Sequence, residues 1–379
     1  MAVLSERRGE KRIGVTRFAV PPLPGTRLIQ GPFNYWKSVF TGGEGAENAL
    51  SRVIDGLFMA MTSIKGYLYV VGAAVLWASS GVAGKSLFAG GVTPFELVQI
   101  RVTVSTVLLA VVFSLRDRSL FRIRARDLVY FFLLGGVAMA LVQITYFYAV
   151  SKIQVAAAIF LQYLGPFLVA FYAVCFWKER LTLTKSLSLL ISLLGCYLVV
   201  GGYDVDLLRM NWAGIVSALC SAVCFAAYTL LGEKGMHRYT PWTVLFYAFF
   251  FATLSWHIFY PPFHYLHAGF SLGQWRWLLY ISVMGTVLPF ALFFMGINLI
   301  RSTRASITAT LEPISAGLFA YLFLGEGLAP LQVVGGAMVV GAIVLLQLKR
   351  EQDDLAPAII RTRLVMGEAR SEHMRRVSR

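Results

Sequence analysis

The side chains of this chain that are best placed to do chemistry are ionisable groups inside long apolar segments. Glu312 lies near the middle of one such segment, directly before Pro313, and Arg101 lies inside another. A charge at the centre of a bilayer costs about 2.5–3.5 kcal/mol on insertion scales, so we expect both groups to face protein or water. Three interpretations of Glu312 stay open: the wall of a cavity, a structural carboxylate, or a proton-coupling group.

The surroundings of Glu312 favour a cavity wall. On a helix, one face carries a stripe made of Ala305, Thr308, Glu312 and Ser315. Pro313 has no N–H, so the carbonyl of Ala309 lacks its helical donor near the middle of the segment. For Arg101, two roles are open: it binds an anionic group of a substrate, or it pairs with Glu96 or Glu312.

Other polar and aromatic side chains in the apolar segments extend this candidate site. With Arg101, Thr308 and Glu312, the predicted cavity residues are Trp77, Ser80, Gln143, Tyr146, Gln162, Tyr163 and Tyr228. Aromatic rings in helices also serve plain packing, which is the competing interpretation for Trp77, Tyr146 and Tyr228. Prolines inside helices produce kinks, so Pro166, Pro289 and Pro313 are the predicted hinge positions.

The elements that must position these residues are membrane-spanning helices. Hydrophobic residues make up 58 % of the 379 residues and charged residues 14 %, whereas soluble domains are about a quarter charged. Apolar runs of about 18 residues or more predict transmembrane helices, because lipid offers the backbone no hydrogen-bond partners. We identify ten, at roughly 66–88, 94–115, 128–150, 153–177, 186–203, 212–232, 241–260, 275–299, 305–324 and 329–348.

The segments form two copies of one block. Thr93-Pro94 recurs as Thr240-Pro241, and Pro166 recurs as Pro313, both at an offset of about 147 residues. An odd number of spans in each copy inverts the second relative to the first, and inverted repeats are typical of transporters that alternate access around a midplane site. The sequence thus predicts an all-α polytopic membrane protein of two inverted five-helix repeats.

Positive charge sets the orientation. Lys and Arg collect in alternate loops, above all in Arg116–Asp127, which predicts that these loops and both termini are cytoplasmic. The net charge of +15 does not indicate nucleic-acid binding, because no basic stripe is interleaved with aromatic residues. The four cysteines lie inside predicted spans without a CxxC pair, so neither a metal site nor a cofactor is expected.

The chain divides into four predicted parts. Residues 1–65 form a basic cytoplasmic extension, disordered or absent if translation starts at Met59 or Met61; residues 66–203 and 212–348 form the repeats; residues 349–379 form a basic cytoplasmic tail. Small residues recur in the fifth and tenth spans, as Ser188-xxx-Ser192 and Ala337-xxx-Gly341. Such patterns let helices approach closely, so we expect these two spans to pack, and they are the candidate surface for a homo-oligomer.

The sequence also resembles a known family. Pro166 followed by Lys178-Glu179-Arg180-Leu181, and Leu311-Glu312-Pro313 followed by Leu324-Gly325-Glu326, are similar to the EamA-type transporters of the drug/metabolite transporter superfamily. The resemblance covers about residues 66–348 and implies a central cavity lined by both halves. It further implies export of small metabolites such as amino acids across the cell membrane, with efflux of drugs or toxic compounds as the alternative. An enzyme motif such as HExxH or the Walker pattern does not occur, and a membrane scaffold would not explain Glu312 and Arg101.

Overall fold

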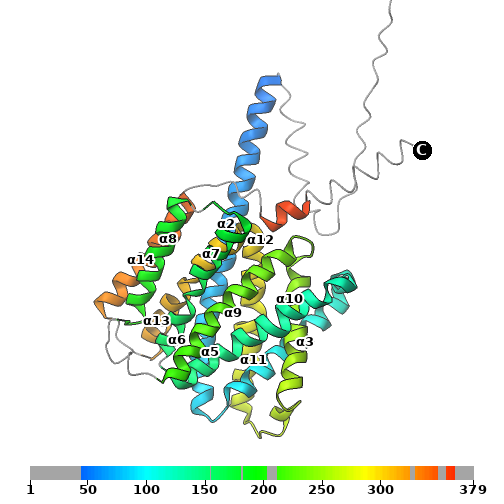
Figure 1. Cartoon of the computed structure of the whole chain (residues 1–379), viewed down its shortest axis with the longest axis vertical. Coiled ribbons are helices and arrows are strands. Elements are labelled where there is room, and N and C mark those ends of the chain that lie inside the picture. The colour runs from blue at the N-terminus through cyan, green and yellow to red at the C-terminus, as the bar shows by residue number, and fades with distance from the viewer. Residues whose placement is uncertain are drawn as a thin grey trace, which may run out of the picture. The chain divides into compact units, whose positions relative to one another are not determined.

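Every described element of the chain is helical. The structure is a computed structural model that describes residues 44–153, 155–180, 182–202, 211–324, 329–348 and 356–362. Within these residues eight helices are long and apolar enough to cross a membrane, and α8 (Leu183–Val199) is a shorter apolar helix. The protein is therefore an all-α, multi-pass membrane protein, as predicted (Figure 1).

The two five-helix repeats follow one another along the chain. The first comprises α2 (Glu44–Ala89), α3 (Pro94–Arg116), α4 (Leu128–Phe132) with α5 (Ala140–Lys152), α6 (Val155–Gln162) with α7 (Gly165–Trp177), and α8. The second comprises α9 (Trp212–Met236), α10 (Pro241–Phe259), α11 (Leu272–Ser282) with most of α12 (Leu288–Ala309), the end of α12 with α13 (Leu311–Leu324), and α14 (Pro330–Leu348). Five crossings per repeat make the second repeat inverted.

The second helix of each repeat begins in the same way. Thr93 caps α3 and Thr240 caps α10, each hydroxyl accepting a backbone N–H three residues later, and each is followed by a proline. A threonine cap satisfies an N–H that the first helical turn leaves unpaired, and proline at the first position loses no bond. The repeated Thr-Pro pair is therefore a repeated helix start.

The first helix differs from its prediction at one end. We expected the span to start at about residue 66, but α2 begins at Glu44. Hydropathy marks where a helix enters lipid, whereas Ala, Leu and Glu residues before that point still favour helix. The other parts of the predicted extension (1–43) and most of the predicted tail (349–355 and 363–379) lie outside the described residues.

The third and eighth spans both contain a π-helical segment. Leu133–Met139 joins α4 to α5, and Val283–Val287 joins α11 to α12. A π-helical turn widens the helix and frees backbone groups, and such turns occur often at functional sites. The fourth and ninth spans instead contain breaks, between Gln162 and Gly165 and at Thr310, each just before a proline.

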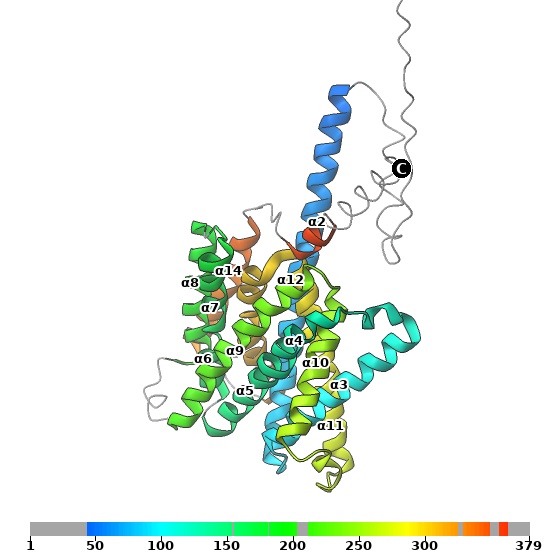
Figure 2. The same cartoon turned by 45° about the vertical axis from the view of Figure 1, so that its right-hand side comes forward.

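Helices α8 and α14 pack against each other along one edge of the bundle (Figures 1 and 2). A Cβ atom added at Gly195 would lie 2.7 Å from the carbonyl oxygen of Gly335, so only glycine allows this approach. The small residues of these helices thus serve contacts within one chain. The homo-oligomer remains a prediction.

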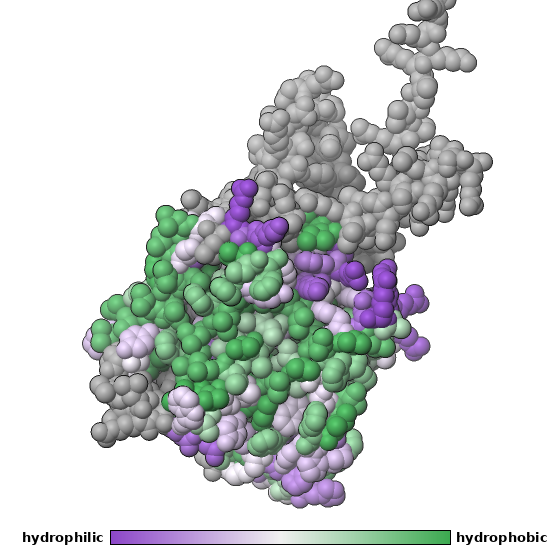
Figure 3. Space-filling model, viewed as in Figure 1, coloured by the Kyte–Doolittle hydropathy of each residue, from purple (hydrophilic) through white to green (hydrophobic). Residues whose placement is uncertain are grey.

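The outward surface of the helices suits lipid. The face seen in Figure 3 is mostly hydrophobic across its middle, and hydrophilic side chains gather toward its two ends. Large exposed apolar side chains include Phe171, Phe176, Leu190, Leu194 and Val223. In water such an apolar surface would cause aggregation, but in a bilayer it is the surface expected to face the lipid chains.

Candidate functional site

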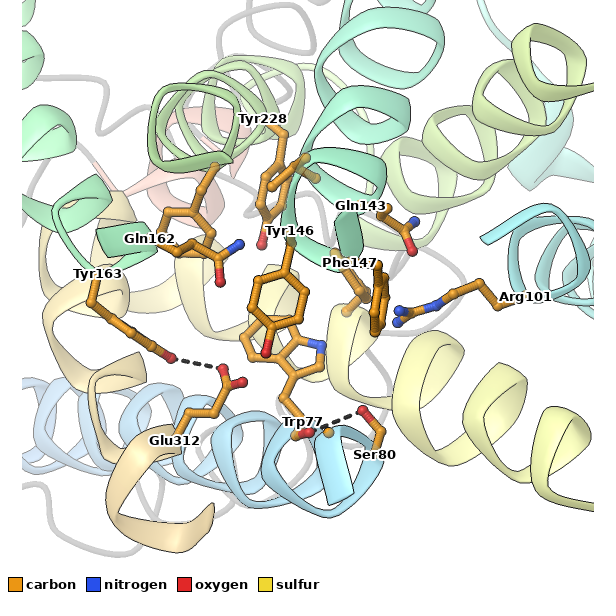
Figure 4. A pocket seen from close by; sticks show the side chains of 14 residues that line it. Trp77, Ser80, Arg101, Gln143, Tyr146, Phe147, Gln162, Tyr163, Tyr228 and Glu312 are labelled. Carbon is orange, nitrogen blue, oxygen red and sulfur yellow. Dashed lines mark hydrogen bonds between the residues drawn. The ribbon is translucent and has the colours of Figure 1, made fainter. Parts of the chain in front are cut away.

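A cavity lies among helices of both repeats (Figure 4). Its volume is about 70 Å³, enough for on the order of five water molecules. The residues that line it are Trp77, Ser80, Gly81, Arg101, Val142, Gln143, Tyr146, Phe147, Gln162, Tyr163, Phe225, Tyr228, Phe290 and Glu312. They come from α2, α3, α5, α6, α9, α12, α13 and the break before α7, so the cavity depends on how both repeats pack.

Glu312 lines one side of the cavity and contacts Tyr163. The Tyr163 hydroxyl lies 2.7 Å from Glu312 Oε2 and donates over 2.8 Å to the carbonyl oxygen of Ala309. Ala309 is the residue whose carbonyl Pro313 leaves without a helical donor, and Tyr163 supplies that donor. One hydroxyl proton serves two acceptors here.

Arg101 lies on another side of the cavity and is held by the π-helical segment of the eighth span. Its Nε donates to Thr286 Oγ1 over 2.8 Å, and one terminal nitrogen donates to the Gly285 carbonyl oxygen over 2.9 Å. Pro289 has no N–H to bond Gly285 at helical spacing, so this carbonyl too is taken by a cavity side chain. The Phe147 ring centroid lies 5.1 Å from the guanidinium carbon, within cation–π range.

The ion pairs considered for Arg101 do not form. Among the described contacts, Arg101 has no carboxylate within 4.0 Å, and Glu96 instead caps α3 through Thr93 and lies 3.7 Å from His264. Each π-segment acceptor is neutral, so the hydrogen bonds fix Arg101 in place without neutralising it. Arg101 and Glu312 are therefore two opposite charges that line one cavity without contacting each other.

Aromatic side chains fill the space between these charges. The Trp77 ring packs edge-on against Phe290 at 5.1 Å between centroids, and Tyr228 lies 5.4 Å from Phe225. In Figure 4 the Trp77 and Tyr146 rings lie between Glu312 on one side and Arg101 on the other. Such a lining excludes most water and strengthens the electrostatic attraction of any charged ligand.

The remaining predicted residues divide into two groups. Ser80 and Gln162 also line the cavity, Ser80 donating to the Trp77 carbonyl and Gln162 Nε2 donating to Ser221 Oγ over 2.8 Å. Thr308 does not: it is fully buried, and its hydroxyl donates to the Arg304 carbonyl within its own helix. The prediction that Thr308 shares a face with Glu312 is wrong, because the helix breaks at Thr310, between these two residues.

Some lining residues were not predicted from sequence. Val142, Phe147, Phe225 and Phe290 line the cavity, but apolar side chains of this kind occur throughout the spans and carry no distinguishing signal. Gly285 does not line the cavity, but it must be a glycine, because a Cβ atom there would lie 2.4 Å from Ser80 Cβ. The close approach of α2 to the eighth span is what places Ser80 beside the Arg101 site.

A second group of buried charges lies outside the cavity, at the end of the bundle predicted to face the cytoplasm. Arg301 contacts Glu233 at 3.1 Å and Glu179 at 3.1 Å, and Glu179 also contacts Lys185 at 3.0 Å. Arg301 and Arg304 lie between the eighth and ninth predicted spans, where α12 bends at Arg301, and they are 4 % and 5 % exposed. The carboxylates of Glu179 and Glu233 pair with Arg301 in the protein interior.

The backbone at Arg301 is unusual. Its φ of 68° lies in the left-handed region, which non-glycine residues rarely adopt, and α12 changes direction there. The next N–H, of Ser302, donates to Glu233 Oε2 over 2.7 Å. The charge cluster therefore holds both the side chain of Arg301 and the backbone that follows it. It joins α8, α9 and α12 to the segment between α7 and α8 that carries Glu179.

Comparison with known proteins agrees with this architecture. Two segments of the chain, residues 64–201 and 212–348, match the model of the EamA-like transporter family. The chain belongs to this family. It is a member of the drug/metabolite transporter superfamily whose two repeats both match one family model.

Individual relatives carry transporter names. The chain is 26 % identical over 75 % of its length, and 95 % of the relative's, to the "uncharacterized inner membrane transporter YicL" of Salmonella typhimurium. It is 24 % identical to the threonine/homoserine exporter RhtA of Escherichia coli, over 55 % of this chain and 67 % of that protein. An archaeal protein of Archaeoglobus fulgidus, named only as a transporter, is 31 % identical over 53 % of this chain and 70 % of its own.

A solved crystal structure shares the fold. It superposes with a TM-score of 0.59 at 20 % identity and covers 75 % of this chain and 96 % of its own. At this identity the likeness supports the fold alone.

Proposed function

We propose that this EamA-like transporter is a secondary carrier that moves small amino acids out of the cell. The observation that carries the proposal is the placement of Arg101 and Glu312 on one cavity without contact between them. An α-amino acid presents a carboxylate for the guanidinium and an ammonium group for the carboxylate. Charge-assisted hydrogen bonds of this kind are about twice as strong as neutral ones.

The cost of burying these charges supports a role in binding. A carboxylate and a guanidinium among apolar spans are expensive, and the free energy is recovered when an oppositely charged ligand group pairs with each. The relative named as a threonine/homoserine exporter is consistent with such a ligand and with outward transport.

Efflux of larger drugs is the second candidate, because seven aromatic side chains line the cavity. Flat apolar cations stack well on such rings. The cavity volume of about 70 Å³ favours the smaller ligand, although a carrier that changes state can enlarge its site.

Alternating access would follow from the inverted repeats. Rocking one repeat against the other exposes the cavity to one side of the membrane and then to the other. In this proposal both termini and the arginine-rich loop lie on the cytoplasmic side of the inner membrane. Reporter fusions at the C-terminus test that orientation. A reporter active only outside the cytoplasm contradicts it.

The direct test uses the purified full chain in proteoliposomes loaded with unlabelled amino acid. Uptake of the labelled amino acid by counterflow supports the carrier. The label must be recovered unchanged, because a converted product would indicate an enzyme instead. A panel of dye-like cations run in parallel decides against the drug carrier if they neither compete nor accumulate.

A further inference from the structure

Two buried polar groups of the cavity have no partner in the described structure. Gln143 is 4 % exposed, and neither its Nε2 nor its Oε1 has a hydrogen-bond partner. Tyr228 is 1 % exposed, and its hydroxyl likewise has none. Both side chains line the cavity and point into it in Figure 4, Gln143 toward the side occupied by Arg101.

The assignment of the amide atoms does not affect this finding. The nitrogen and oxygen of a glutamine are easily exchanged, but here both lack partners, so either orientation leaves two groups unpaired. Buried polar groups without partners are rare in native structures and call for an explanation, often a ligand.

The fold does not require these polar groups. At the repeat offset of 147 residues, seen in the Thr106–Thr253 pair, Gln143 corresponds to Phe290 and Tyr228 corresponds to Gly81. Phe290 and Gly81 line the same cavity. The mirror positions thus build the same wall with a side chain that makes no hydrogen bond, or with none at all.

Under the proposed function the charged groups of an amino acid pair with Arg101 and Glu312, and neither charged group alone can satisfy the Gln143 amide. A carboxylate only accepts, so it leaves the amide oxygen unpaired, and an ammonium group only donates, so it leaves the amide nitrogen unpaired. A hydroxyl or a carboxamide both donates and accepts. Such a group can pair with the Gln143 amide or with the Tyr228 hydroxyl, both of which line the cavity.

We propose that Gln143 and Tyr228 select amino acids whose side chain carries a hydroxyl or carboxamide group, over apolar amino acids of the same size. This inference rests on the proposed amino-acid transport and adds its specificity. A site built to hydrogen-bond a substrate group rejects the analogue without it, because the buried groups of the site then stay unpaired.

The experiment is counterflow of labelled threonine and valine, which have nearly the same shape, by the full chain in proteoliposomes. We expect the parent protein to prefer threonine by at least about tenfold in transport efficiency, the size expected for unpaired buried groups. Tyr228→Phe and Gln143→Leu should each reduce that preference at least about fivefold. Tyr172→Phe, which removes a hydroxyl outside the cavity, is the matched control and should leave it unchanged.

A thermal-unfolding measurement without substrate separates binding from structure. Because the unpaired amide destabilises the empty protein, Gln143→Leu should raise its apparent melting temperature, whereas loss of a structural amide would lower it. A lower melting temperature, or an unchanged threonine preference in both variants, overturns the inference.

The outcomes distinguish this inference from the proposed function. If the parent carries threonine and valine equally, amino-acid transport stands and the selectivity assigned to Gln143 and Tyr228 is wrong. If the parent carries neither, the proposed function fails and the inference fails with it.

Discussion

The hydroxyls of Thr106 and Thr253 lie 2.8 Å apart, and these two residues are separated by 147 positions in the chain. This separation is the offset that relates the two repeats. A residue can touch its own symmetry mate only where the symmetry axis passes, so the pair marks the pseudo-two-fold axis between α3 and α10. Residues away from this point are free to differ between the repeats, as Arg101 and Ala248 do.

The Thr106–Thr253 contact should contribute modestly to stability. Thr106→Val and Thr253→Val each remove it, so the double variant should be more stable than the sum of the single effects predicts. We expect a coupling free energy of about 0.6 kcal/mol, the average for hydrogen bonds between membrane helices. A double-mutant cycle of unfolding in detergent micelles measures it, and strict additivity would contradict the contact.

Replacing the carboxylate of Glu312 should impair transport. The Glu312→Gln side chain can still reach Tyr163, but it cannot pair with an ammonium group, so we expect transport to fall by about tenfold or more. Because the amide does not titrate, the loss should persist over a pH series. The measurement is counterflow at each pH. Transport at the parent rate throughout would make Glu312 structural or irrelevant.

The buried charge cluster should dominate stability at its end of the bundle. Glu233→Gln leaves Arg301 with a weaker partner in a buried setting, and we expect a loss of about 3–5 kcal/mol in the free energy of unfolding. Arg238→Gln breaks an ion pair with Asp127 whose arginine is 59 % exposed, and it should cost about 0–1 kcal/mol. Chemical unfolding of both variants tests this contrast, which fails if they are equally stable.

Gly285 should tolerate no side chain. A Cβ atom there meets Ser80 Cβ at 2.4 Å, and neither atom can swing aside, so Gly285→Ala should cost about 1–3 kcal/mol and displace an acceptor of Arg101. Gly341 in α14 has no atom within 4 Å of the same position. Gly341→Ala should therefore stay within about 0.5 kcal/mol of the parent in thermal unfolding. Equal effects at both sites would contradict the close approach of α2.

Sequence reasoning worked best where a local rule has one outcome. The predicted spans 94–115 and 241–260 start at the same residues as α3 and α10, where a Thr-Pro pair caps each helix through neighbours in the chain. Prolines also show which carbonyl oxygens lose a helical donor, and Tyr163 and Arg101 take two of these acceptors. Glu312 was predicted as a site residue because a charge in an apolar transmembrane run is costly whatever surrounds it.

By itself, then, the sequence determined the all-α membrane fold, its duplication and most of the polar side chains of the cavity, since a long apolar run in lipid satisfies its own backbone groups as a helix. Only the tertiary structure decided which side chains contact one another. The contacts of Arg101 with Thr286, of Tyr163 with Glu312 and of Arg301 with Glu179 and Glu233 join residues 68 to 185 positions apart. Helical periodicity does not specify such contacts, because they depend on how separate helices pack.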